Sequence, residues 1–258
     1  MNDEERYLFD LQGYIILKNV LDAEMVARMN AFIDAKAVHD PKWQGGMGND
    51  HIEYPITWSP DFLTLLDHPC TMPFLMEIMG TRIRMDHDYA IFLQPGHKGS
   101  YLHGPTRMLP YDPLHYYHFI KGQICCGLSV AAFALTDVSE ASGGFAVISG
   151  SHKVNYLIPE DIRTFERESP IVQQVPMQAG DCAIFTESLW HGTLPWQGPG
   201  VRRTLFLKYA PHPLAWSDEG YVPQRRIETP DAWMESLNET QRALLSPPSA
   251  HNFREPLG

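Results

Sequence analysis

The chain from residue 82 onward is divided into short stretches rich in β-branched and aromatic residues, each bounded by turn-forming residues such as glycine, proline or aspartate. Strands at this spacing, without helical patterns between them, are typical of an antiparallel sandwich or barrel. The pattern therefore indicates a mainly β fold for this part of the chain. The stretches, in chain order, are RIRMDHDYAIFLQPG, QICCGLSVAAFALTDV, FAVIS, IVQQVPM, CAIFTESLWHG and RRTLFLKYAP.

The first 80 residues have a different character, with one short strand followed by helical patterns. YIIL at 14–17 predicts the strand, and Asp22 is a good N-cap for the helix that follows it. The dipeptide SP at 59–60 marks the start of a second helix. TMPFLMEIMG predicts a third helix, ended by its glycine. One more helix is expected in the tail, from the TP dipeptide at 229–230 to about residue 245.

These patterns together predict a single domain of class α+β, mainly β, over residues 1–258. A chain of 258 residues buries one sizeable core and does not require a second. We expect a helical part over about residues 1–80, a β-barrel over about 82–212 and a helical tail over about 213–258.

Charge and composition narrow the classes of partner. The formal net charge of −11 argues against nucleic acid or an anionic membrane, because both favour basic surfaces. Nowhere do 18 apolar residues run together, and the polar start MNDEERYLFD has no signal-peptide pattern. The four cysteines fit neither a disulfide framework nor a CxxC metal clamp. We expect a cytoplasmic protein with reduced thiols, monomeric or a small homo-oligomer, that acts on a small molecule.

Two of the twelve histidines stand out from the rest. His103 ends YLH and His191 ends SLWH, and each precedes a glycine. They lie near the start and the end of the predicted barrel, and such positions face each other across the interior of a closed barrel. Each histidine alone is more often a structural residue, so the context of His191 decides the interpretation.

The segment after His191 carries the groups that a carboxylate ligand would need. In HGTLPWQGPGVRR, Thr193 follows two residues after His191, and Arg202 opens the returning strand. A guanidinium holds a carboxylate through two parallel charge-assisted hydrogen bonds. Arg202 and Arg203 could instead be an exposed basic pair that opens a strand. This alternative to carboxylate binding stays open for Arg203.

The order of several motifs resembles the phytanoyl-CoA dioxygenase family over roughly residues 8–212. These motifs are GYIILKNVLDAEMV, LHGP, LTDVSEASGGFAVISGSHK, AGDCAIFTESLWHGTLPW and RRTLFLKYAP. The resemblance implies a double-stranded β-helix, a jelly-roll or cupin-like barrel with N-terminal helices packed on one sheet. It also implies the cofactors iron(II) and 2-oxoglutarate. No basic cluster suited to a CoA phosphate stands out in the sequence, so the family name does not identify the substrate.

The resemblance assigns a role to four residues. His103 and His191 match the two iron-binding histidines of the family. Arg202 matches the arginine that binds the distal carboxylate of 2-oxoglutarate, and Thr193 matches a hydroxyl that assists it. The implied activity is that of an iron(II)- and 2-oxoglutarate-dependent dioxygenase that hydroxylates a small organic substrate.

The chain departs from the family at residue 105. The family pattern is His-x-Asp, and here Pro105 stands in place of the aspartate. Three explanations compete for this departure. First, the carboxylate ligand comes from elsewhere in the chain, with Asp112, Asp86 and Asp88 as candidates. Second, the position is left open for a halide or water; related iron halogenases replace the acid with a small residue and so leave room for chloride. Third, full metal coordination is lost and the chain is a non-catalytic ligand-binding barrel.

The segment PTRMLPYDPLHYYHFIK, between two glycines at 104 and 122, has no clear periodicity. It holds three tyrosines and two histidines within eight positions, 111–118. Because a loop of this length inside a compact domain is usually functional, we expect it to form a wall of the binding site.

Overall fold

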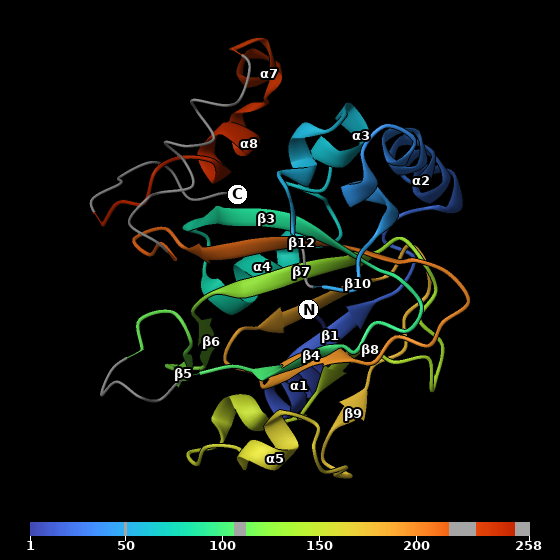
Figure 1. Ribbon diagram of the computed structural model, residues 1–258. Coiled ribbons are helices and arrows are strands. Elements are labelled where there is room, and N and C mark those ends of the chain that lie inside the picture. The colour runs from blue at the N-terminus through green and yellow to red at the C-terminus, as the bar shows by residue number, and fades with distance from the viewer. Residues whose placement is uncertain (49–50, 106–111, 217–230, 251–258) are drawn as a thin grey trace.

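Two antiparallel sheets that face each other form the body of the molecule (Figure 1). The structure is a computed structural model that describes residues 1–48, 51–105, 112–216 and 231–250. The larger sheet has the order β1 (Tyr14–Leu17), β10 (Cys182–Thr186), β7 (Ser129–Ala134), β12 (Arg202–Pro211), β3 (Ile83–Leu93), β2 (Ile52–Glu53). The smaller sheet has the order β4 (Ser100–His103), β11 (His191–Leu194), β8 (Gly144–Val147), β9 (Gln173–Gln174).

Neighbouring strands in both sheets come from distant parts of the chain, as in a jelly roll. This arrangement confirms the predicted class, a mainly β, α+β double-stranded β-helix. A separate hairpin consists of β5 (Tyr117–Ile120) and β6 (Gln123–Cys126). The helices are α1 (Asp3–Gln12), α2 (Ala23–Ala37), α3 (Pro60–Leu63), α4 (Met72–Met79), α5 (Glu160–Arg163), α7 (Asp231–Ser236) and α8 (Glu239–Leu244), with 3₁₀ turns at Pro41–Gln44, Pro55–Thr57 and Ser151–Lys153.

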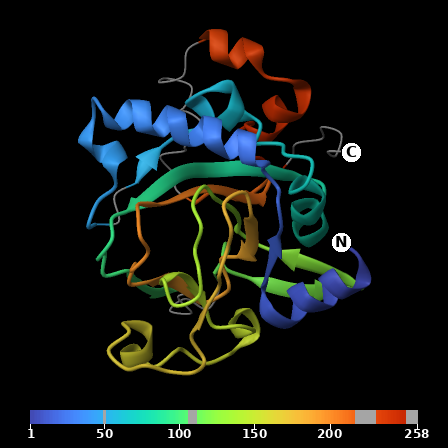
Figure 2. The same ribbon diagram turned by 90° about the vertical axis from the view of Figure 1, so that its right-hand side faces the viewer.

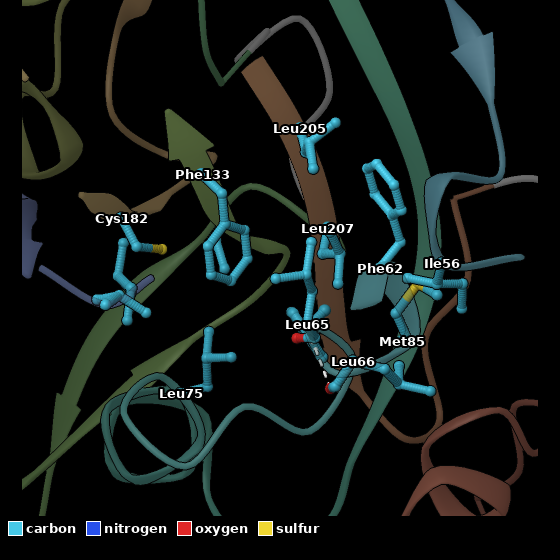
Figure 3. Packing of buried hydrophobic residues seen from close by; sticks show 14 of the residues in the cluster. Ile56, Phe62, Leu65, Leu66, Leu75, Met85, Phe133, Cys182, Leu205 and Leu207 are labelled. Atoms are coloured by element: carbon cyan, nitrogen blue, oxygen red, sulfur yellow. Dashed lines mark hydrogen bonds between the residues drawn. The ribbon is translucent and has the colours of Figure 1, made fainter. Parts of the chain in front are cut away.

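The larger sheet is buried on both faces, and its strands alternate between two hydrophobic clusters. On β7, Phe133 faces the helices, whereas Val130 and Ala132 face the barrel interior. β12 follows the same rule, because Leu205 and Leu207 join Phe133 in the outer cluster. Figure 3 shows these side chains packed against α3 and α4. The strict period of two is the reason that β12 presents its remaining side chains to the cavity.

Three helices, α2, α3 and α4, cover the outer face of the larger sheet (Figure 1). α2 lies across that face (Figure 2) and buries Val26, Met29 and Ile33. The predicted start of this helix is confirmed, because the Asp22 carboxylate accepts a hydrogen bond from the Met25 amide at 2.7 Å. In the described part of the chain, no helix is long and apolar enough to cross a membrane.

The long apolar run QICCGLSVAAFALTDV forms two strands instead of one. It breaks between β6 and β7, where the Gly127 amide donates to the Tyr116 carbonyl. A side chain at Gly127 has no room, since a Cβ there would lie 1.9 Å from the carbonyl oxygen of Leu114. The backbone of residues 114–116 therefore packs against Gly127, where β6 of the hairpin ends and before β7 of the larger sheet begins.

Both ends of the chain also differ from expectation. The acidic start forms α1, a helix that was not expected. A capping box between Asn2 and Glu5 stabilises its N-terminus. The expected single tail helix is two helices, because Asn238 caps α8 with its own capping box. The expected start at 229–230 lies outside the described residues. The strand predicted at 14–17 is confirmed as β1, and it joins the larger sheet together with β2, which was not expected.

His152 joins α1 to the hairpin and gives the fold a pH dependence. Its Nε2 lies 3.1 Å from the Asp10 carbonyl oxygen, and its ring packs edge-on against Tyr117. Burial lowers the pKa of His152 from 6.5 to about 4. The unfolded chain therefore binds the proton first as the pH falls, so stability is full above pH 6.5 and decreases towards pH 4.

We expect this single group to remove up to about 3 kcal/mol of unfolding free energy between pH 6.5 and pH 4. The measurement is denaturant unfolding of the wild type and of His152→Gln across that range. The wild type is expected to lose more stability than the variant as the pH falls. Parallel pH curves for the two proteins would contradict the assignment.

Candidate metal centre

His103 and His191 lie directly opposite each other on neighbouring strands. The register of β4 and β11 pairs the two residues, and their ring centroids are 4.1 Å apart. Both side chains line one cavity between the sheets. The structure thus brings together two histidines that are 88 positions apart in the sequence, but as neighbours on adjacent strands of the smaller sheet, and not across the barrel interior as the sequence predicted.

Each histidine places one ring nitrogen against a backbone carbonyl two residues earlier. His191 Nδ1 lies 2.7 Å from the Leu189 oxygen, and His103 Nδ1 lies 3.4 Å from the Tyr101 oxygen. A carbonyl oxygen only accepts, so Nδ1 carries the proton and Nε2 of a neutral ring keeps its lone pair. Burial, assisted by the neighbouring His103, lowers the pKa of His191 to about 3, so this ring is neutral at pH 7.

A carboxylate that the sequence interpretation missed lies beside the two histidines. Glu187 follows β10 in the turn that leads to β11, and its Oε1 is 3.9 Å from His191 Nε2. One ligand atom from each of Glu187, His103 and His191 lies within 4.8 Å of the other two. The available signal was the spacing in ESLWH, which puts a glutamate four residues before the second histidine.

Glu187 forms a buried ion pair with Lys208. Its Oε1 lies 2.8 Å from Lys208 Nζ, and the two side chains are almost entirely buried. Burial opposes ionisation of Glu187, but the positive charge of Lys208 and the adjacent histidines hold the pKa of its carboxyl below the ordinary value. Burial likewise opposes the charge of Lys208, and Glu187 raises its pKa above the ordinary value. The pair is therefore charged at neutral pH.

Arg202 lies in the same cavity as the histidines, as the sequence predicts. It is 4 % exposed, and its Nε has no hydrogen-bond partner. Among the described residues, no carboxylate pairs with its guanidinium, and burial lowers the pKa of Arg202 to about 10. Gly144 leaves room for it, since a Cβ there would lie 3.3 Å from the Arg202 Nε. Thr193 lines the cavity two residues after His191.

Arg203 has a different role from its neighbour. It pairs with Asp34 and donates a 2.8 Å hydrogen bond to Asn30, both on α2. Its side chain therefore ties α2 to β12 on the outer face, and the alternation of the strand separates it from the cavity.

The cavity has a volume of about 420 Å³ and a largely aromatic lining. Tyr89 stacks on His51 with ring centroids 4.1 Å apart, and on its other side it stacks on Phe206. His115 and Trp216 contribute another wall, with their rings packed edge-on at 5.6 Å. His115 comes from the segment expected to form a wall of the site, whose residues 106–111 lie outside the described part of the chain.

The three aspartates considered as substitutes for the family carboxylate do not line the cavity. Asp112 holds the His115 ring at 3.0 Å, Asp86 pairs with Arg84 and His87, and Asp88 accepts from the Ile56 amide at 2.9 Å. Pro105, next to the first histidine motif, is buried. The carboxylate that the structure brings to the histidines is Glu187.

The donor set fits the two groups that the sequence implies. Two imidazole nitrogens and a carboxylate oxygen are ligands suited to iron(II), and two histidines with one carboxylate leave coordination positions open. An unpaired buried guanidinium is costly unless an anion binds to it, and Arg202 lines the cavity that the histidines share. The residues present therefore fit both a divalent metal and a carboxylate co-substrate.

Comparison with known proteins supports the same interpretation. Residues 9–204 match the family model described as phytanoyl-CoA dioxygenase (PhyH). Iron(II) and 2-oxoglutarate, the cofactors predicted from the sequence, are those of this family. No curated protein matches the chain at a significant level.

Solved structures resemble the fold at low sequence identity. HygX from Streptomyces hygroscopicus with nickel and 2-oxoglutarate bound has a TM-score of 0.74 and 22% identity, covering 83% of this chain and 89% of HygX. HygX with nickel, 2-oxoglutarate and hygromycin B has a TM-score of 0.69 and 21% identity, with coverages of 83% and 89%. SnoK, a carbocyclase from nogalamycin biosynthesis, has a TM-score of 0.58 and 19% identity, covering 82% of this chain and 85% of SnoK. At this level of identity, the likeness concerns the fold.

Proposed function

Because the chain belongs to the phytanoyl-CoA dioxygenase family, we propose that it is an iron(II)- and 2-oxoglutarate-dependent oxygenase that hydroxylates a small organic substrate. His103 and His191 are the proposed iron ligands, and Arg202 and Thr193 the proposed contacts to 2-oxoglutarate. The observation that carries the proposal is one cavity holding two paired histidines, a carboxylate and an unpaired buried arginine.

When bound, iron(II) with 2-oxoglutarate supplies oxidation by dioxygen, in which the co-substrate becomes succinate and carbon dioxide while a substrate C–H bond becomes C–OH. The protein supplies placement and electrostatics for this chemistry. His191 and His103 offer neutral Nε2 lone pairs, because their Nδ1 atoms face backbone carbonyl oxygens. Each ring is thereby held in the orientation that a ligand requires.

Arg202 and Thr193 account for recognition of the co-substrate. The Arg202 guanidinium opens β12 and Thr193 lies on β11, and both line the cavity of the histidines. A carboxylate bound there would satisfy an arginine that has no anionic partner among the described residues. Thr193 adds a hydroxyl donor on the same wall.

The aromatic walls favour a small organic substrate with flat or apolar surface. Tyr89, Phe206 and Trp216 line the cavity and offer aromatic surface to such a substrate. HygX binds hygromycin B and SnoK is a carbocyclase, which supports small molecules as the substrate class and leaves the reaction type to experiment.

Anaerobic addition of iron(II) and 2-oxoglutarate is expected to produce a weak visible metal-to-ligand charge-transfer band. Admission of dioxygen is then expected to convert 2-oxoglutarate slowly to succinate even without substrate, measured by mass spectrometry. The control omits iron(II) and contains a chelator. If the protein retained no metal and developed no band, the oxygenase proposal would have to be abandoned in favour of a non-catalytic ligand-binding barrel.

A halogenase on the same scaffold is the second candidate, because Pro105 removes the carboxylate from the family position. Chloride that occupies a position on the metal should shift the charge-transfer band. The measurement is the same anaerobic titration in chloride and in sulfate at equal ionic strength. A band that does not respond to chloride favours the hydroxylase.

A further inference from the structure

We propose that Glu187 supplies the carboxylate ligand that Pro105 cannot, so that the metal is held by His103, His191 and Glu187. The inference rests on the proposed function and goes beyond it, because it moves the third ligand from the strand of the first histidine to the turn before the second. Glu187 approaches the histidines from the end of β10, on the opposite sheet from β4.

The first argument is convergence. Within the described residues, His103, Glu187 and His191 are the one group of at least three potential metal-ligating side chains whose ligand atoms lie within 4.8 Å of one another. A single ion in the cavity therefore has all three within reach after small side-chain rotations.

The second argument is that the three candidate ligand atoms, Nε2 of the two histidines and Oε1 of Glu187, are all hydrogen-bond acceptors. The Leu189 carbonyl fixes the proton of His191 on Nδ1, so its Nε2 presents a lone pair. Oε1 of the Glu187 carboxylate, 3.9 Å away, also only accepts. His103 adds a third acceptor when its Nδ1 donates to the Tyr101 oxygen. Acceptors that face one another across the cavity repel unless a cation lies between them, and a metal ion is such a cation.

The third argument concerns Lys208. Its ammonium lies 2.8 Å from Glu187 Oε1 and supplies the positive charge that a buried carboxylate requires. The bond from Lys208 to Glu187 Oε1 leaves the Nε2 atoms of the two histidines without a donor among the described residues, since the hydrogen bonds of these rings run from Nδ1 to backbone oxygens. Lys208 therefore keeps Glu187 ionised and in place, and it competes electrostatically with a metal for the same carboxylate.

The alternative is that Glu187 and Lys208 form only a structural ion pair. Removing Lys208 is expected to strengthen metal binding in both interpretations, because a positive charge near the ion disappears. The two interpretations differ for the charge-neutral double variant, in which no unpaired lysine repels the metal and binding weakens only if Glu187 is a ligand.

The experiment is a Co²⁺ titration without dioxygen or 2-oxoglutarate, followed by calorimetry and by the visible absorption of bound Co²⁺. The variants are Glu187→Gln, Lys208→Met and the combination of the two. Glu140→Gln is the matched control, because it makes the same chemical change at an exposed glutamate. Circular dichroism and thermal unfolding check that each variant folds.

Glu187→Gln is expected to weaken Co²⁺ binding about 100-fold and to change the visible spectrum, and Lys208→Met to strengthen binding about tenfold. The double variant is expected to bind clearly more weakly than the wild type, whereas Glu140→Gln matches it. Equal binding by the wild type and the double variant would overturn the ligand assignment, since Glu187 would then act only by neutralising Lys208.

The outcomes separate this inference from the proposed function. If the wild type binds Co²⁺ and Glu187→Gln binds it equally well, the inference fails and the oxygenase proposal stands on the two histidines. If the wild type binds no metal, both fail. Should Glu187→Gln not fold, the double variant with Lys208→Met decides, because binding equal to that of the wild type contradicts the assignment.

Discussion

His191→Ala is expected to abolish metal binding and 2-oxoglutarate turnover. His191 begins β11, and its buried ring packs against Phe185. Its Nδ1 donates to the Leu189 oxygen, and its Nε2 lies towards Glu187. Alanine removes the proposed ligand atom from the cavity. Changes to residues that merely orient ligands cost 10- to 100-fold in affinity, so loss of the ligand itself should exceed about 100-fold. Calorimetric Co²⁺ titration and succinate formation measure the two effects.

His39→Ala is the control for this variant, because it removes an exposed histidine that precedes the 3₁₀ turn at Pro41–Gln44. It should bind Co²⁺ like the wild type. His103→Ala is expected to behave like His191→Ala, since the two rings face each other across the same strand pair. Metal retention by both histidine variants would refute this site as the metal centre.

Arg202→Met is expected to raise the 2-oxoglutarate concentration required for half-maximal turnover about 100-fold while leaving metal affinity nearly unchanged. The guanidinium is buried and has no carboxylate partner among the described residues, so a co-substrate carboxylate would supply its charge-assisted bonds. Two such bonds are worth about 3 kcal/mol, which corresponds to about 100-fold in concentration. The measurement is succinate formation against 2-oxoglutarate concentration, with Co²⁺ calorimetry alongside.

The neighbouring arginine provides a matched control. Arg203→Met removes the same charge one residue away, but that side chain pairs with Asp34 and Asn30 on the outer face. It should lower the unfolding free energy by about 1 kcal/mol and leave the 2-oxoglutarate requirement unchanged. Equal effects of the two substitutions on that requirement would show that Arg202 has no specific role in co-substrate binding.

Much of the secondary structure follows from local patterns. Asp22 begins α2 as expected, and the alternation on β12 puts Leu205 and Leu207 on the helix side. The same alternation, counted from Arg202, places Phe206 and Lys208 in the cavity, so Lys208 was predictable in principle. The break at Gly127 was not, because it depends on a backbone segment that packs against it from 13 residues earlier in the chain.

The sequence by itself determined the fold class, because period-two strands and turn residues are local properties of the chain, and its resemblance to a known family named the two histidines and Arg202 as candidate site residues. Only the tertiary structure decided which carboxylate meets the histidines. Asp112, Asp86 and Asp88 lie near His103 in the sequence, but each carboxylate binds another group: the His115 ring, Arg84 and the Ile56 amide, respectively. Glu187 reaches His103 because closure of the two sheets brings the end of β10 over β4, and that distance is set by packing of the barrel and not by residue spacing.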